Sequence, residues 1–106
     1  MNLGTTICGV SFKNPIIAAS GTFGFGHEMA EFIDVSRIGG IVSKAVTAKR
    51  REGNSSPRIA ETASGCLNAV GLQNPGVDAF IKTELPFMNE LGTRVIVNVS
   101  DRKSVV

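Results

Sequence analysis

The stretch Ile16-Ile17-Ala18-Ala19-Ser20 decides the fold, because it predicts the first strand of a parallel sheet. The stretch is short and almost wholly apolar, and turn residues bound it, as is typical of a strand buried on both faces. A second stretch of this kind follows downstream, Ile41-Val42-Ser43-Lys44-Ala45-Val46. Two such strands in succession predict an α/β fold with a helix between them.

The segment between the two strands carries the predicted helix. Residues His27–Ile33 have helical periodicity, with Met29, Phe32 and Ile33 on one side, and residues 34–37 finish or extend the helix. The pair Gly39-Gly40 ends it. The order strand, loop, helix, strand is a parallel βαβ unit.

The flanking segments extend this pattern in both directions. Upstream, alternating residues around Gly9 predict a short β-hairpin over Thr5–Phe12. Downstream, Asn74 is a candidate N-cap and Pro75 opens a helix that Pro86 kinks or splits and Gly92 ends. The apolar residues of this helix recur at helical spacing: Val77, Phe80, Ile81, Leu85 and Met88. Residues 94–99 then predict a third strand.

The βα rhythm allows two architectures, a doubly wound open sheet and a (β/α)8 barrel. A barrel needs about 250 residues. This chain of 106 residues holds three of the expected strands. We predict an α/β fold that is the N-terminal portion of a (β/α)8 TIM barrel, preceded by a short β-hairpin.

Composition excludes several classes of function. With 42% hydrophobic and 19% charged residues and a net charge of +2, the chain is typical of globular proteins, and no nucleic-acid partner is expected. No apolar stretch approaches the roughly 20 residues that span a membrane. Cys8, Cys66 and a single histidine do not make a metal site. Nothing at the N-terminus resembles a signal peptide, so we expect a cytoplasmic protein.

Three polar side chains follow the predicted strands. Ser20, Lys44 and Asn98 stand at the carboxyl ends of successive strands, which meet at one edge in both architectures. A hydroxyl, a cation and an amide are therefore expected at one ligand-binding face. Lys44 is suited to pair with a ligand carboxylate or to stabilise charge on a reduced cofactor ring. A Schiff-base role is the competing chemistry for this lysine.

Two glycine-bearing segments lie beside this edge. The loop Gly21–Gly26 has the spacing G-x-x-G-x-G, which is not a dinucleotide fingerprint, and we expect no phosphate to bind there. The connection Thr47–Gly71 is long and polar but not of low complexity, which favours a functional role.

The segment Asn68–Gly76 is rich in amides and glycines and lacks charge. Asn68 and the backbone around Gly71 are suited to hydrogen-bond a small polar ring. Cys66, just before it, has no neighbouring base, so a small buried or half-buried thiol is the preferred interpretation over a nucleophile.

Four blocks of sequence, taken together, resemble the dihydroorotate dehydrogenases. They are Asn14–Gly26, Ser43–Ala45, Pro57–Thr62 and Asn68–Gly76, in the same order as in that family. The resemblance covers Leu3 to about Ser100. The form Ser-Gly-Thr-Phe-Gly-Phe-Gly is most similar to the class 1B, NAD-linked catalytic subunit, rather than to the fumarate-linked class 1A or the quinone-reducing class 2.

The resemblance implies a barrel with FMN across its C-terminal mouth. It implies oxidation of dihydroorotate to orotate in pyrimidine (UMP) biosynthesis, with electrons passed to NAD through a partner subunit that carries FAD and a 2Fe–2S cluster. The intact family protein is a homodimer that binds this partner. The implied FMN contacts are Ser20, Lys44, Ala45 and Asn98, and the implied substrate contacts are Lys44, Asn68, Ala69, Val70, Gly71 and Leu72.

The chain also departs from the family pattern. The family's cysteine base lies on a later loop, so no catalytic residue is expected in this chain, and Cys66 does not take that place. Residues 1–100 are expected to form the barrel portion, and Asp101–Val106 a non-matching tail left by truncation or cloning. We expect the chain alone to be inactive, since three strands cannot close a barrel. The alternatives are a complete flavodoxin-like binding module and a Schiff-base aldolase fragment that uses Lys44.

Overall fold

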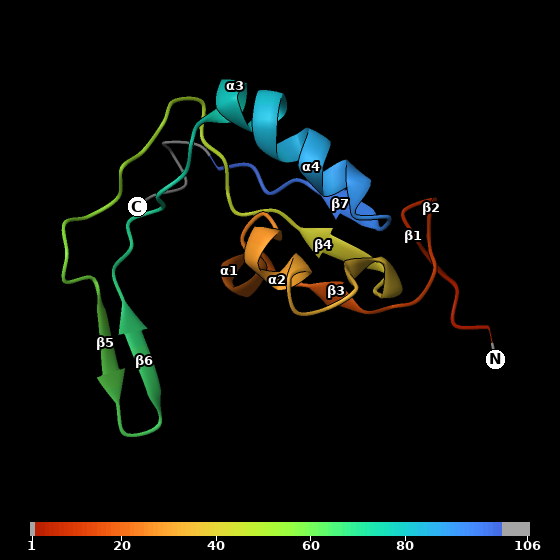
Figure 1. Cartoon of the computed structure of the whole chain (residues 1–106), viewed down its shortest axis with the longest axis horizontal. Coiled ribbons are helices and arrows are strands. Elements are labelled where there is room, and N and C mark those ends of the chain that lie inside the picture. The colour runs from red at the N-terminus through yellow and green to blue at the C-terminus, as the bar shows by residue number, and fades with distance from the viewer. Residues whose placement is uncertain (1, 101–106) are drawn as a thin grey trace.

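A computed structural model describes residues 2–100 of the chain (Figure 1). Its centre is a parallel sheet in the order β3-β4-β7, built from β3 (Ile17–Ala18), β4 (Gly40–Val42) and β7 (Arg94–Ile96). Ile41 of β4 pairs with Ala18 on one side and Val95 on the other. The predicted α/β class and parallel βαβ unit are confirmed. A barrel and a doubly wound sheet of order 3-2-1-4-5-6 both begin with this order of strands, whereas a flavodoxin-like sheet of order 2-1-3-4-5 does not. Closure into a barrel stays a prediction.

All three strands are shorter than predicted, since β4 ends at Val42 rather than at Val46 and β7 ends at Ile96 rather than at Val99. The first, β3, covers only Ile17–Ala18, and Ser20 already begins α1 (Ser20–Phe23), a single turn within the segment predicted to be a loop. Ile16 is 61% exposed, so the strand is not buried along its whole length. Gly24 ends the turn at φ +60°, a conformation that glycine adopts without strain.

The predicted N-terminal hairpin is confirmed. Strand β1 (Thr5–Ile7) pairs antiparallel with β2 (Val10–Phe12), and Cys8 and Gly9 form the turn at φ +49° and +78°. Arg94 Nε donates to the carbonyl of Ser11 at 2.9 Å, which ties the hairpin to the amino end of β7. The hairpin therefore closes the end of the sheet opposite the predicted ligand edge.

The helical segment between β3 and β4 is broken. Helix α2 (His27–Ala30) lasts one turn, and a 3-10 turn, η1 (Val35–Arg37), follows. Met29 packs against the core as predicted, but Phe32 is 80% exposed and Ile33 46% exposed. The predicted apolar face is wrong beyond Ala30, because the helix ends there and its periodicity no longer applies.

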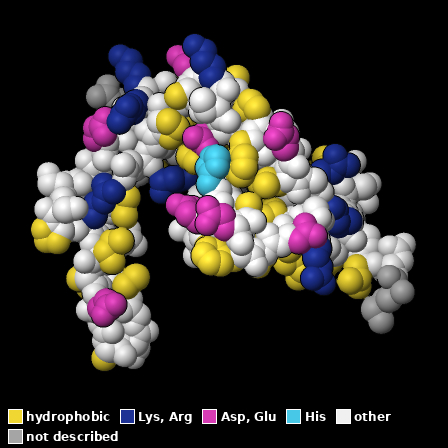
Figure 2. Space-filling model, viewed as in Figure 1, with side chains coloured by type: hydrophobic (Ala, Val, Ile, Leu, Met, Phe, Trp, Pro, Cys, Tyr) yellow, Lys and Arg dark blue, Asp and Glu magenta, His cyan; other side chains and the backbone are white. Residues whose placement is uncertain are grey.

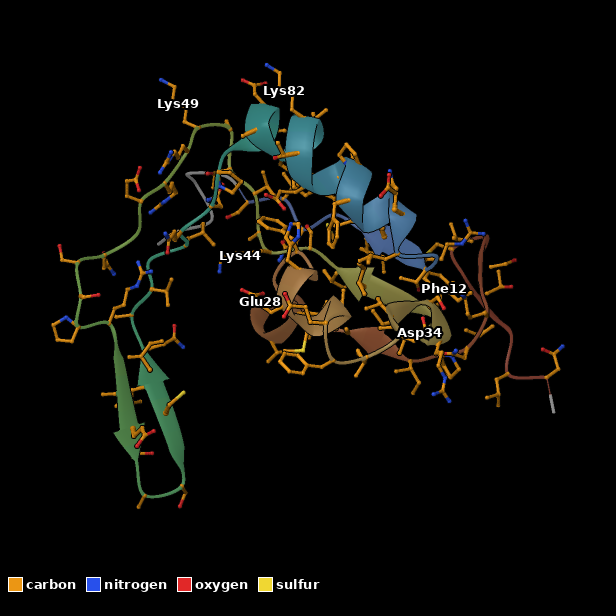
Figure 3. The ribbon with its side chains drawn as sticks, in the orientation of Figure 1. Phe12, Glu28, Asp34, Lys44, Lys49 and Lys82 are labelled. Carbon is orange, nitrogen blue, oxygen red and sulfur yellow. The ribbon has the colours of Figure 1, made fainter. Side chains whose placement is uncertain are left out.

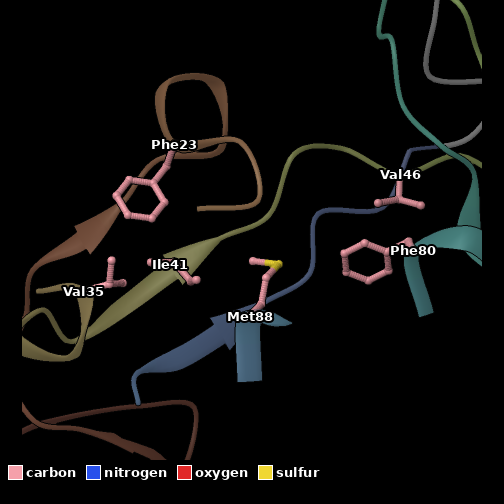
Figure 4. Packing of buried hydrophobic residues seen from close by; sticks show 6 residues of the cluster. All are labelled: Phe23, Val35, Ile41, Val46, Phe80 and Met88. Carbon is pink, nitrogen blue, oxygen red and sulfur yellow. The ribbon is translucent and has the colours of Figure 1, made fainter. Parts of the chain in front are cut away.

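The hydrophobic core lies between this sheet and the helices that cover it (Figure 4). Ile41, from the middle strand, and Met88 are fully buried. Together with them, the core cluster contains Phe23, Val35, Val46 and Phe80. This packing fixes the sheet from which the carboxyl-edge side chains project.

The helix before β7 runs through three conformations, α3 (Val77–Ala79), a π-type turn η2 (Phe80–Glu84) and α4 (Leu85–Glu90). Within it, the Leu85 N–H donates to the carbonyl of Phe80, five residues back. The wider turn stands just before Pro86, which lacks an N–H and crowds the preceding turn of a regular helix. The predicted break is confirmed as this change of winding. Gly92 follows the helix at φ +71°, as expected for its end.

Asn74 is not the N-cap of this helix. Gly76 occupies that position, and the helical residues begin at Val77 rather than at Pro75. The buried Asn74 side chain bonds instead to neighbouring loops.

A second hairpin lies within the long connection after β4 and was not predicted. Strands β5 (Ile59–Thr62) and β6 (Gly65–Asn68) pair antiparallel, and all eight residues are exposed. Figure 1 shows this hairpin standing away from the sheet. Its turn, Ala63-Ser64, lacks the Asn-Gly or Asp-Gly signature of short hairpins, which explains why the pattern did not reveal it.

Candidate functional site

The polar residues that follow the parallel strands meet at one edge of the sheet. Ser20 follows β3, Lys44 follows β4 and Asn98 follows β7. Asn98 Nδ2 donates to Ser20 Oγ at 3.3 Å, and both residues are half-buried. The structure therefore joins the two outer strand ends across the middle one.

Ser43 links these side chains, and sequence reasoning missed it. Its side chain is fully buried, and its Oγ accepts the Asn98 backbone N–H at 3.0 Å and donates to the carbonyl of Lys44 at 3.1 Å. A serine inside an apolar strand was the available signal, because a buried hydroxyl requires hydrogen-bond partners. Ser43 thereby fixes Lys44 and Asn98 relative to each other.

Lys44 lies at the mouth of a hollow. Its backbone N–H donates to the carbonyl of Gly24 at 2.9 Å, which anchors the glycine loop beside it. Its side chain points into an open hollow of about 390 Å³ between the parallel sheet with its helices and the segment that leads to β5 (Figures 2 and 3). The hollow is lined by Phe25, Lys44, Arg50, Arg51, Glu52, Gln73, Asn74 and Pro75.

The charges around this hollow favour an anion. Three cationic residues, Lys44, Arg50 and Arg51, face one carboxylate, that of Glu52. Glu52 Oε1 is already paired with Arg50 Nε at 2.8 Å, and both side chains are more than 70% exposed. The ammonium of Lys44 is thus free of an acidic partner among the described residues and is suited to a ligand carboxylate.

Hydrogen bonds hold the uncharged segment after β6 against residues 54–58, which precede β5. Asn54 donates from its backbone N–H to Val70 at 3.0 Å and from Nδ2 to Ala69 at 2.8 Å, in each case to the carbonyl oxygen. The Ala69 N–H donates to the carbonyl of Arg58 at 2.8 Å, and Arg58 Nη2 donates to Gln73 Oε1. These contacts of Asn54 and Arg58, together called the seat, hold residues 69–73 in one conformation.

Glycines allow residues 53–54 and residues 70–71 to approach each other closely. A Cβ atom on Gly53, at φ +76°, would lie 2.3 Å from the carbonyl oxygen of Val70. A Cβ atom on Gly71, at φ +79°, would lie 2.9 Å from Asn54. Neither position admits a larger residue without displacement of the backbone.

Within residues 2–100, several donors of this segment remain unused. No protein acceptor bonds the backbone N–H groups of Val70, Gly71 and Leu72, or the exposed amide of Asn68. Ala69 differs, because its N–H and its carbonyl are both engaged. Residues 68–72 do not line the hollow, whereas their neighbours Gln73 and Asn74 do. The free donors make this stretch a candidate ligand-binding loop beside Lys44.

Comparison of the sequence with known proteins places the chain in a family. A family model described as dihydroorotate dehydrogenase matches residues 2–106. The chain belongs to the dihydroorotate dehydrogenase family.

Three relatives named dihydroorotate dehydrogenase B (NAD(+)), catalytic subunit, show the extent of the similarity. The Petrotoga mobilis protein is 57% identical over 94 residues, which are 89% of this chain and 31% of the relative. The Lachnoclostridium phytofermentans protein is 56% identical over 99 residues, or 93% and 33% of the two chains. The Caldicellulosiruptor saccharolyticus protein is 52% identical over 100 residues, or 94% and 33%. The chain therefore spans about a third of the length of these relatives.

Two cysteines and the histidine are further candidate reactive side chains among residues 2–100. Cys8 and Cys66 are free and exposed, so the prediction of a buried or half-buried Cys66 is wrong. Cys66 lies in the projecting β5–β6 hairpin, whose strand residues are all exposed. His27 Nε2 lies 2.7 Å from Glu84 Oε2 and its ring stacks on Phe87, which joins α2 to the later helix.

Residues 2–100 lack the features of two other kinds of site. They contain no group of three histidine, cysteine or acidic side chains placed to hold a metal ion. None of their helices is both long enough and apolar enough to cross a membrane. The predicted non-matching tail, Asp101–Val106, lies outside the described residues.

Proposed function

We propose that this chain forms the N-terminal third of the catalytic subunit of a class 1B, NAD-linked dihydroorotate dehydrogenase. The whole protein would oxidise dihydroorotate to orotate in UMP biosynthesis. One observation carries the proposal: Ser20 and Asn98 meet across the carboxyl edge of the sheet, with Lys44 between their strands. The names of the relatives support the same activity.

The donor set at this edge fits the ring end of FMN. A hydroxyl, a carboxamide and an ammonium offer both donors and acceptors, which match the polar edge of a flavin ring. Ser20, Lys44, Ala45 and Asn98 would hold that edge, with Ser43 fixing two of them from behind. Bound FMN would supply the acceptor for the hydride that leaves dihydroorotate.

Lys44 and the adjoining loop would bind the substrate. The Lys44 ammonium would pair with the carboxylate of dihydroorotate. Asn68, Val70, Gly71 and Leu72 would donate to its ring through the free amide and N–H groups. Ala69 would contribute its methyl group alone, since both its backbone groups are engaged. The proton that leaves the substrate would pass to a cysteine base supplied by the rest of the protein.

The rest of the assembly is also part of the proposal. The relatives' name, catalytic subunit, supports a partner that passes electrons to NAD, and we assign FAD and a 2Fe–2S cluster to that partner. The whole catalytic subunit would be a cytoplasmic homodimer whose (β/α)8 barrel begins with the strands described above.

Family membership favours this function over both alternatives. A flavodoxin-like module and a Schiff-base aldolase each account for a βα rhythm, but neither accounts for a family match over residues 2–106. Borohydride treatment in the presence of a carbonyl substrate should therefore leave Lys44 unlabelled. Covalent trapping on Lys44, located by mass spectrometry, would restore the aldolase interpretation.

The test uses the full-length protein. It can be obtained by following the reading frame past codon 106, or by joining residues 1–100 to the remaining part of the Petrotoga mobilis subunit. We expect Lys44→Met to keep part of its bound flavin through Ser20, Ala45 and Asn98. We expect the KM of the flavin-loaded protein for dihydroorotate to rise by about 10- to 100-fold, since a charge-assisted hydrogen bond is lost. A wild-type protein that binds flavin but does not oxidise dihydroorotate would contradict the proposal.

A further inference from the structure

We infer that Asn74 is a positioning residue that locks the substrate-binding loop in its binding conformation. The inference rests on the proposed function, because it assigns the lock to the same site. Asn74 is not one of the residues proposed above to bind the substrate or the flavin. It acts through the carbonyl of Leu72 and through Thr47, which lies five residues after the end of β4.

The Asn74 side chain uses its full hydrogen-bonding capacity. It is 5% exposed, and its Oδ1 accepts the backbone N–H groups of Thr47 at 3.1 Å and Gly76 at 3.0 Å. Its Nδ2 donates to the Leu72 carbonyl at 2.8 Å and to Thr47 Oγ1 at 3.0 Å. The Asn74 backbone also pairs with Arg51 in both directions, at 3.0 Å each. One residue therefore connects the loop, the strand end and the start of the next helix.

The loop requires such a lock because its backbone is strained. Leu72 is held at φ +58°, next to Gly71 at φ +79°. Glycine adopts this left-handed conformation readily, but a leucine side chain disfavours it. Strained residues persist where surrounding contacts over-determine them, and the bond from Asn74 Nδ2 is the contact made to Leu72 itself. Release of that bond should let the free N–H groups of residues 70–72 move out of register with the substrate.

Asn14 offers a matched control within the same chain. It too precedes a proline, its Oδ1 accepts the N–H two residues on, from Ile16 at 3.1 Å, and its Nδ2 donates to the Arg37 carbonyl at 2.9 Å. Asn14 lies before β3, at the amino end of the sheet, far from the carboxyl edge. At both positions Asn→Asp removes the donor that faces a backbone carbonyl and keeps the acceptor for the N–H two residues on, which separates positioning of the loop from general turn stability.

The experiment measures steady-state kinetics of the flavin-loaded full-length protein. Asn74→Asp keeps the acceptor and replaces the donor that faces the Leu72 carbonyl. We expect it to raise the KM for dihydroorotate about tenfold, with kcat within about threefold, whereas Asn14→Asp leaves KM within about twofold. An Asn74→Asp protein whose KM changes no more than that of Asn14→Asp would overturn the inference.

A second pair of variants covers the case in which Asn74→Asp fails to fold. Thr47→Val removes the hydroxyl that holds the Asn74 amide, and Thr47→Ser keeps it. We expect faster backbone hydrogen exchange at residues 70–72 and a higher KM in Thr47→Val, and near wild-type values for both in Thr47→Ser. Equal exchange in the two variants would contradict the lock. An inactive wild type with the expected exchange pattern would instead locate the failure in the proposed function.

Discussion

Individual hydroxyl groups fix the local geometry at two distant places in the chain. Ser43 does so at the carboxyl edge, where its buried Oγ joins Lys44 and Asn98. Ser36 does so near the other end of the sheet, where its Oγ donates to Asp34 Oδ1 at 2.6 Å and its N–H donates to the same oxygen at 3.1 Å. The first contact is buried and the second is exposed, so their expected consequences differ.

Ser43→Ala should destabilise the fold and loosen the flavin edge together. The substitution leaves the part-buried N–H of Asn98 without its acceptor, which costs about 1–3 kcal/mol. We expect chemical denaturation of the full-length protein to show a loss in this range, together with a lower bound flavin content. An unchanged free energy of unfolding would show that the hydroxyl makes no net contribution.

Asp34 should show a pH effect of defined sign. Hydrogen bonds from the Ser36 hydroxyl and then the Ser36 backbone hold the pKa of the Asp34 carboxyl below its ordinary value. A lowered folded pKa gives a contribution to stability that is present above the ordinary pKa and is lost as pH falls through the folded pKa. Ser36→Ala should raise the pKa of Asp34 toward its ordinary value, as followed by NMR titration of the side chain. A pKa unchanged by this substitution would refute the assigned cause.

Among the elements, the connection after β4 differs most from its sequence-based expectation. It was predicted to be a functional loop, and it contains the β5–β6 hairpin and the residues that hold the proposed substrate-binding segment. Apolar periodicity revealed the three central strands and the later helix, because the buried positions of an element require apolar residues at a regular spacing. The seat could not be predicted, since it depends on amide hydrogen bonds between segments about 15 residues apart. The misassignment of Asn74 as a helix cap has the same origin, because local sequence does not reveal its contact with Thr47.

Gly53 and Gly9 form a pair that tests this seat. Both adopt left-handed conformations, at φ +76° and +78°, but a Cβ atom would meet the Val70 carbonyl at Gly53 and nothing within 4 Å at Gly9. Gly9→Ala should cost about 1–2 kcal/mol from backbone strain alone. Gly53→Ala should cost clearly more and should also raise the KM for dihydroorotate. Equal losses of stability, measured by denaturant titration, would mean that the Val70 carbonyl moves aside for the added methyl group at no cost in free energy.

At the scale of the whole molecule, the described strands leave an open sheet. The outer strands β3 and β7 each pair on one side within residues 2–100, and large apolar side chains such as Val99, at 78%, remain exposed. A protein of the relatives' length, about three times that of this chain, would have room for the further strands that close a barrel.

The isolated chain should therefore lack both flavin and cooperative unfolding. An incomplete core with open edges favours a loosely packed or aggregated state over a two-state domain. We expect purified residues 1–106 to be colourless, inactive toward dihydroorotate, and without a sharp thermal transition. A monomer that melts cooperatively would show that the three-stranded unit folds alone.

The most direct test of the central claim is anaerobic reduction of bound flavin in the full-length protein. Dihydroorotate is added and the loss of flavin absorbance is followed. We expect rapid bleaching in the wild type, and in Lys44→Met bleaching only at much higher dihydroorotate concentrations, with the two samples adjusted to the same concentration of bound flavin. Flavin that dihydroorotate fails to bleach in the wild type, or that bleaches identically in both proteins, would contradict the claim.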